Sequence, residues 1–299
     1  MRVLKSAIML SLLAAQVPAA AANKAPLSLP ATSKWEMNYD EDSCHLFRLF
    51  GSGEQSTLLA LTREGPSDWL QMTVVSKQVK YNGIAVPVEV AVGNQAAPYK
   101  LSGVALTSTE KDGSKRPVIK VEGLRLDGWQ WPRDKAAMVN PPATSPQTEA
   151  AVTALTIKVP GKQPIRLETG SLGEPMKAMR ACTDDLLQHW GYDPKVHAAL
   201  SKRAAPTANP GRWLRSEDFP YTALTEGHNG MVRFRLDIAP DGAVTGCRVL
   251  YRTNPDDFAD LSCKLLLQRA RMTPALDAAG KPVKDYYIST IRWVAGTSW

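Results

Sequence analysis

The sequence predicts an α+β protein with a β-rich N-terminal domain that ends in a helix, followed by a small β-β-α-β module. Three observations support this prediction. Short apolar or alternating runs, separated by Gly, Pro, Asn and Asp, fill the first half of the chain with no long helix between them. A helical stripe of apolar residues then closes this region. The last third holds a hairpin, a second helical stripe and one further strand.

Residues 1–22 have the layout of a secretory signal peptide, with Arg2 and Lys5 before a short apolar run and small residues up to Ala22. An uncleaved inner-membrane anchor is the alternative, but the run is shorter than the roughly 20 residues of a spanning helix. Without Arg2 and Lys5, the 36 cationic residues fall to 34 against 29 acidic ones. This mild excess is spread along the chain, which argues against a nucleic-acid partner.

Residues 35–195 are expected to form the first domain, after a lead rich in Pro, Ser and Thr at 25–33. A sandwich or barrel-like sheet is favoured by the runs TLLALT, WLQMTVV, VPVEVAV, PVIKVEGLRL and ALTIKVP. The run AMVNPPATSPQTEA is expected to be a surface loop. The closing helix is predicted by apolar residues at spacings of three and four, with Gly191 as its cap: Met176, Met179, Cys182, Leu186 and Trp190.

The four cysteines of this exported chain suit two disulfides, for which three connectivities exist. Pairing within each region is the simplest solution, namely Cys44 with Cys182 and Cys247 with Cys263. A loop the size of the second should add about 3 kcal/mol of stability. Metal ligation is the alternative, but no Cys-x-x-Cys spacing occurs, so we expect no metal site.

Residues 196–211 have the composition of a linker, and the second domain is expected at 212–299. Two alternating strands around Asp241-Gly242 predict a hairpin, because glycine supplies the positive φ that such turns need. The alternation of apolar and polar residues shifts by one residue near Gly246, which indicates a β-bulge. A helix is expected to begin at residues 254–257, and a third strand is expected from Asp285.

Five segments carry a family resemblance in this domain: FPYTA at 219–223, GMVRFRLDIAPDGAV at 230–244, CRV at 247–249, ARMTPA at 270–275 and GKPV at 280–283. In wording and order they resemble the C-terminal domain of TonB, as found in stand-alone energy-transducer-like proteins of Gram-negative bacteria. The resemblance implies a periplasmic domain that binds an extended peptide of an outer-membrane receptor, or of another envelope protein, by adding a strand.

The strand from Asp285 to Val294 is the natural edge for such an addition. The residues expected to bind the partner are Tyr286, Tyr287, Ile288, Ser289, Thr290 and Ile291. A proton-driven transducer also needs an inner-membrane helix and a long Pro-rich spacer, whereas this chain has a cleavable N-terminus and a folded domain. We therefore expect a binding module, with a link to TonB-dependent outer-membrane transport as a hypothesis.

Two other functions remain as alternatives. Edge-to-edge pairing would make the module an envelope scaffold that self-associates, with a homodimer as its product. The second alternative is a hydrolase activity in the N-terminal domain, but no Gly-x-Ser-x-Gly elbow or phosphate-binding loop occurs. The histidines show no metal-ligand spacing and are His45, His189, His197 and His228. We therefore expect no enzyme activity and no cofactor.

Overall fold

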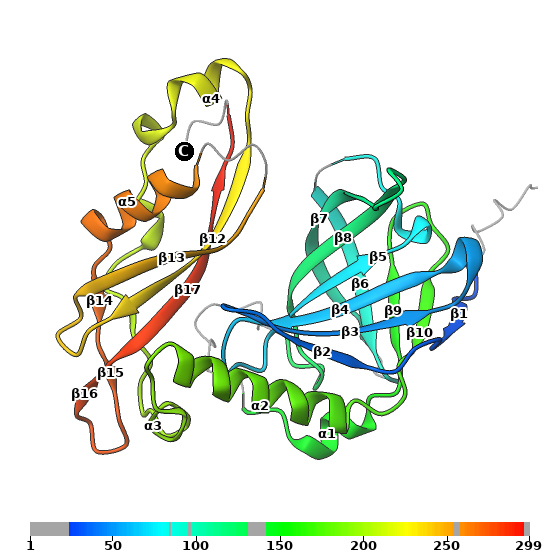
Figure 1. Ribbon diagram of the computed structural model, residues 1–299, viewed down its shortest axis with the longest axis horizontal. Helices are drawn as coiled ribbons and strands as arrows, with labels where there is room; N and C mark the ends of the chain where they lie inside the picture. The colour runs from blue at the N-terminus through cyan, green and yellow to red at the C-terminus, as the bar shows by residue number, and fades with distance from the viewer. Residues whose placement is uncertain (1–23, 84, 95–96, 131–141, 254–257, 296–299) are drawn as a thin grey trace, which may run out of the picture.

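The computed structural model describes residues 24–83, 85–94, 97–130, 142–253 and 258–295. The predicted signal peptide and the predicted helix start at 254–257 lie outside these residues. Figure 1 shows two parts, a large curled sheet and a three-stranded sheet that carries a helix. The structure confirms the α+β class and the β-β-α-β order of the C-terminal module.

The N-terminal sheet has ten strands in the order β1-β10-β9-β6-β7-β8-β5-β4-β3-β2. They are β1 (Leu27–Pro30), β2 (Glu36–Tyr39), β3 (Cys44–Phe50), β4 (Thr57–Arg63), β5 (Leu70–Val75), β6 (Ala85–Val92), β7 (Tyr99–Thr109), β8 (Lys115–Leu124), β9 (Leu155–Lys158) and β10 (Ile165–Glu168). A bridge between Ala31, which follows β1, and Phe50 of β3 brings the β1 edge of the sheet next to its other end. The expected lead at 25–33 therefore contributes a strand to this sheet, because β1 pairs in parallel with β10.

Three helices follow or interrupt this sheet: α1 (Pro146–Ala151), α2 (Gly173–His189) and α3 (Pro194–Ala198). Helix α1 forms within the run that the sequence indicates as a loop, and Ser145 caps it by accepting from Thr148 N. Helix α2 buries the predicted apolar face against the sheet, including Met176 and Met179. Cys182 of α2 is bonded to Cys44 of β3, so a disulfide ties the helix to the sheet.

The C-terminal sheet has the order β13-β12-β17 and is made of β12 (Gly230–Ile238), β13 (Val244–Arg252) and β17 (Asp285–Trp293). Helix α5 (Ala259–Arg269) packs on one face, and the disulfide between Cys247 and Cys263 joins it to β13. The short elements are α4 (Tyr221–Thr225), β11 (Ala205–Pro206), β14 (Met272–Thr273), β15 (Ala275–Leu276) and β16 (Pro282–Val283).

The predicted hairpin and its bulge are present. Gly242 has a φ of +85°, and a Cβ there would come within 2.4 Å of the Met272 carbonyl oxygen. Ile238 pairs with Val244 and Asp237 pairs with Gly246, so one extra residue, Thr245, produces the register shift. Glycine is therefore required at the turn for two reasons, its backbone conformation and the closeness of the chain after α5.

Part of the expected linker at 196–211 is folded onto the C-terminal module. Strand β11 pairs with β14, and Lys202 forms a bridge with Leu276. The Ala204 N–H donates to the Asp285 carboxylate at 2.8 Å. The composition of this segment is that of a loop, but its backbone groups find partners that lie 70 to 80 residues further along the chain, which local composition does not reveal.

The N-terminal domain lies against the face of the C-terminal sheet opposite α5 (Figure 1). Arg235 pairs with Asp42 at 3.1 Å and its guanidinium lies 3.9 Å from the centre of the Trp190 ring. Arg233, two residues earlier, pairs with Glu64, and Tyr192 donates to Asp237 at 2.9 Å. Alternate residues of β12 therefore serve two cores, one under α5 and one between the domains.

Candidate functional site

Strand β17 is an edge strand, because within the described residues it pairs only with β12. The directions of its main-chain N–H and C=O groups can be derived from the hydrogen bonds between β12 and β13. Ala239 N donates to Ala243 O, and Thr253 N donates to Met231 O, so the odd-numbered residues of β12 face β13. The even-numbered residues of β12 then face β17, since these directions alternate along a strand.

The directions of the main-chain groups alternate in β17 as well, and its register with β12 shows which residues point outward. Phe234 pairs with Ser289 and Val232 pairs with Ile291, so the odd-numbered residues of β17 bond to β12. The N–H and C=O groups of Ile288, Thr290 and Arg292 consequently point away from the sheet. These three residues offer up to six main-chain hydrogen-bonding groups to an added strand.

The side chains of β17 alternate between the two faces of the sheet, as the period-2 pattern predicts. Tyr287 and Ile291 pack into the core beneath α5, and the Trp293 ring stacks 5.0 Å from that of Phe258. On the other face, Ile288 packs in the cluster between the domains, and Thr290 accepts from Arg233 at 3.0 Å.

The first residues of β17 are covered. Asp285 is fully buried and pairs with Arg203 at 2.8 Å. Tyr286 is 7% exposed, because its ring is enclosed by the rings of Trp190, Tyr192 and His197. Of the six residues expected to bind a partner, Tyr286 is therefore a contact between the domains. The other five are partly exposed, and whether they bind a partner stays a prediction: Tyr287, Ile288, Ser289, Thr290 and Ile291.

An apolar hollow of about 790 Å³ flanks the second half of β17 on the α5 side. The segment 210–217 forms one wall, and residues 289–294 form another. Its apolar lining comes from Trp213, Leu214, Phe219, Phe234, Leu266 and Trp293. An extended segment added at β17 would place its inward side chains in or beside this hollow.

A second, polar hollow of about 500 Å³ flanks Tyr286, Tyr287 and Ile288. Its other wall is the connection between β4 and β5, with Arg63 at one end and Gln71 at the other. Burial lowers the pKa of the Arg63 guanidinium to about 10, so the group is still charged at neutral pH. Arg63 pairs with Cys44 of β3 and lies two residues after Leu61, so its side chain is on the core face of β4.

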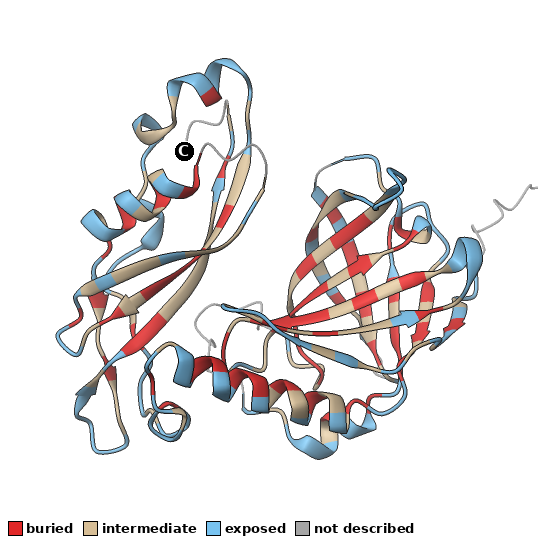
Figure 2. Cartoon of the chain, in the orientation of Figure 1, coloured by how far each residue is buried: buried red, intermediate tan, exposed pale blue. Residues whose placement is uncertain are grey.

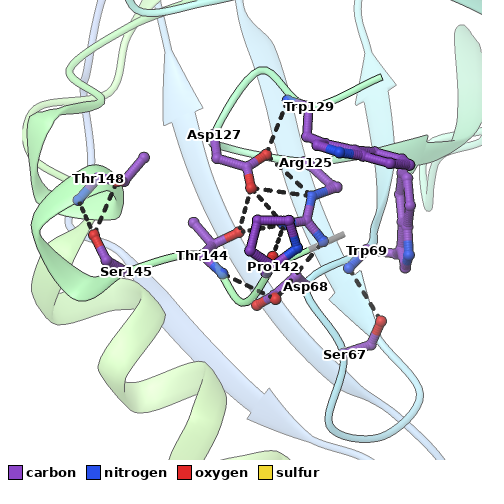
Figure 3. A network of polar contacts seen from close by, with 10 residues as sticks. All are labelled: Ser67, Asp68, Trp69, Arg125, Asp127, Trp129, Pro142, Thr144, Ser145 and Thr148. Atoms are coloured by element: carbon purple, nitrogen blue, oxygen red, sulfur yellow. Dashed lines mark hydrogen bonds and ion pairs between the residues drawn. The ribbon is translucent and has the colours of Figure 1, made fainter. Parts of the chain in front are cut away.

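The buried side chain of Arg125 holds this connection in place (Figure 3). It pairs with Asp127 and with Asp68, the latter at 3.7 Å, and it donates to the Pro142 carbonyl oxygen at 2.7 Å. Its guanidinium also lies 5.2 Å from the centre of the Trp69 ring. One arginine therefore links the segment before β5 to the segment after β8.

Both disulfides have the pairing that the simplest connectivity predicts. Among the described residues, no group of three or more His, Cys, Asp or Glu side chains could hold a metal ion. His45 lies on β3, His189 ends α2, His197 lies in α3 and His228 follows α4. The part of the chain that the structure describes contains no helix long and apolar enough to cross a membrane.

A sheet with a helix on one face and an outer strand with free main-chain groups defines a class of small domain suited to protein binding. Residues 216–294 match the family of the Gram-negative bacterial TonB protein C-terminal. This part of the chain is a TonB C-terminal domain, a module of the Gram-negative envelope that mediates interactions between envelope proteins. No curated protein matches the chain.

Proposed function

We propose that the C-terminal domain captures an extended segment of another envelope protein by adding it as a strand to the outer edge of β17. The observation that carries this proposal is the outward direction of the main-chain groups of Ile288, Thr290 and Arg292, which follows from the register with β12. Each hydrogen bond to an added strand satisfies a group that otherwise bonds only to water. Binding, and not catalysis, is the function in this proposal.

The two hollows support the same proposal. Side chains of an added strand alternate between the faces of the sheet, so some lie on the side of the apolar hollow and others on the side of the polar one. Main-chain bonds would provide affinity and the hollows would provide selectivity. In an exported, periplasmic protein, a receptor of TonB-dependent transport is the partner class that we favour.

Ile288→Pro tests the edge directly. Its outward N–H is lost, but the bonds from β17 to β12 come from the neighbouring residues, so the sheet should stay folded. Seven-residue peptides selected from a random displayed library against the wild type should bind Ile288→Pro at least about tenfold more weakly. Ile288→Ala, which keeps the N–H, is the matched control and should retain binding.

Hydrogen exchange identifies the mode of binding. A selected peptide should protect the amides of Ile288, Thr290 and Arg292, whereas those of Ser289 and Ile291 are already bonded within the sheet. Equal affinity for the wild type and Ile288→Pro, or protection confined to other strands, would show that the peptide binds elsewhere and that the proposal is wrong.

A further inference from the structure

The start of β17 is covered by a cluster of polar side chains around His197. This histidine is the buried residue of α3, being 8% exposed, whereas the other residues of the helix are exposed or partly exposed. Its ring lies parallel to the Tyr286 ring, with 5.5 Å between the two centres. Within the described ranges, neither ring nitrogen of His197 has a hydrogen bond. The ring is therefore placed to pack on Tyr286, and no acceptor is bonded to it that would stabilise an added proton.

The Asp285 carboxylate lies next to this ring and already has three donors. Its Oδ1 accepts from the Tyr286 N–H at 2.7 Å and lies 2.8 Å from the Arg203 guanidinium. Its Oδ2 accepts from the Ala204 N–H at 2.8 Å. The Nε2 of His197 is 3.7 Å from the same Oδ1. A proton on His197 would place a second cation beside a carboxylate whose charge Arg203 already balances.

The other groups around the ring do not supply a further buried negative charge. The charged and titratable groups that surround it are Asp285, Tyr286 and the main chain of Lys284, with Arg203, Tyr192 and Asp193 from the segments that flank α3. Asp193 is exposed and accepts from the Lys195 N–H at 2.8 Å, so water screens its charge. Burial and Arg203 lower the pKa of His197, and Asp285 only partly opposes them.

We infer that protonation of His197 uncovers Tyr286 and thereby lengthens the accessible edge of β17. A buried imidazolium beside a matched ion pair forces one of the two cations into water, either His197 together with α3 or Arg203. Both of them cover the Tyr286 ring, since the Arg203 guanidinium lies 4.8 Å from its centre. Even-numbered residues of β17 point outward, so Tyr286 would extend the edge beyond Ile288. The gain for an added strand rests on the proposed function, whereas the uncovering of Tyr286 does not.

The solvent exposure of the Tyr286 ring tests the inference without any peptide. In the full chain with ¹³C-labelled tyrosine, a neutral gadolinium chelate should enhance the relaxation of the Tyr286 ring protons at least about twofold more at pH 5.0 than at pH 7.0. If His197 has its ordinary pKa of 6.5 in the uncovered form, that form gains up to about 25-fold over this interval. His197→Phe cannot titrate and should show no change. The Tyr99 ring, 3% exposed in the N-terminal sheet, is the internal control.

Arg203→Met should reverse the sign of the effect. Without the guanidinium, protonated His197 takes its place beside Asp285, so acidification should lower the exposure of the Tyr286 ring. The inference is wrong if the relaxation enhancement of the wild type does not change with pH, or if it changes equally in His197→Phe. It is also wrong if Arg203→Met responds to pH as the wild type does.

Peptides separate this inference from the proposed function. Selected seven-residue peptides that lack Asp, Glu and His are extended by two residues at either end in turn. One extension should raise the affinity for the wild type about tenfold at pH 5.0 and leave it unchanged at pH 7.0, and neither extension should help in His197→Phe. If Ile288→Pro weakens every peptide but no extension helps at pH 5.0, strand addition is supported and the lengthened edge is wrong. If no peptide binds at either pH, strand addition is wrong, and the exposure of the ring still decides whether protonation of His197 uncovers Tyr286.

Discussion

At the scale of single residues, several polar side chains are buried at the junction of the two domains, and each has a defined charge environment. His197 lies in α3, stacked on Tyr286 with ring centres 5.5 Å apart. Its Nε2 is 3.7 Å from the Asp285 carboxylate, whose charge is already matched by Arg203. Burial is the main reason that the pKa of His197 is lowered from 6.5, and the Asp285 carboxylate only partly opposes it.

This lowered pKa predicts a dependence of stability on pH. The folded state binds a proton on His197 less readily than the unfolded state, so the free energy of unfolding should fall as the pH drops below about 6.5. The loss continues until the pH reaches the folded pKa. The carboxylates with lowered pKa, such as Asp218, lose their contributions only below their ordinary value of 3.8. Histidine effects therefore dominate between pH 7 and pH 5.

His197→Phe keeps a ring on Tyr286 but cannot titrate. Urea unfolding followed from pH 7 to pH 5 should show a smaller loss of stability for this variant than for the wild type. A residual slope is expected, because burial also lowers the pKa of His45. If the free energy of unfolding changes equally with pH in both proteins, protonation of His197 does not cause the loss of stability.

At the scale of elements, the disulfide between Cys247 and Cys263 joins the bulged strand β13 to α5. It closes a loop with a sequence separation of 16 residues. Replacing both cysteines by alanine should lower the free energy of opening for α5 by about 3 kcal/mol, because the unfolded loop regains its conformational freedom. Hydrogen exchange of the α5 amides measures this change. Unaltered protection would show that the packing of Leu265 and Leu266 alone holds the helix.

The same elements show how far sequence reasoning reaches. Strands, hairpin, bulge and the apolar face of α2 were predictable, because their patterns repeat within one element. Strand β1 was not, since its partner β10 lies about 140 residues later in the chain. The folding of β11 onto β14 was hidden for the same reason. Local pattern determines an element, whereas pairing between distant segments depends on the whole fold.

The candidate site, too, was only partly predictable from the sequence. The edge position of β17 followed from the order of elements in the resembled family. The contact of Tyr286 with the N-terminal domain could not be predicted, because the residues that cover its ring come from the N-terminal domain and α3.

At the scale of the whole molecule, charge complementarity holds the two domains together. Figure 2 shows buried and half-buried residues along β12 and β17. Arg233 and Arg235 of β12 are among the residues of these classes, and they pair with Glu64 and Asp42 of the N-terminal domain. Asp42 is central, because its carboxylate pairs with both Arg235 and Arg248. Arg235 is 6% exposed, so this contact is shielded from salt more than surface pairs are. These contacts cover part of the sheet face opposite α5, whereas the edge of β17 is left open.

Asp42→Arg tests this arrangement. It places three cations together at a partly buried contact, so it should weaken the contact between the domains by about 3 kcal/mol. The radius of gyration from small-angle scattering should then increase, and proteolysis should become faster at 199–204, between the domains. Asp112→Arg makes the same change of charge in the remote turn between β7 and β8 and should have neither effect. Combining Asp42→Arg with Arg235→Asp should restore part of the compact form, because the pair is re-formed with its charges exchanged. If Asp42→Arg leaves both scattering and proteolysis unchanged, the aromatic contacts of Trp190 and Tyr192 with Tyr286 hold the domains without it.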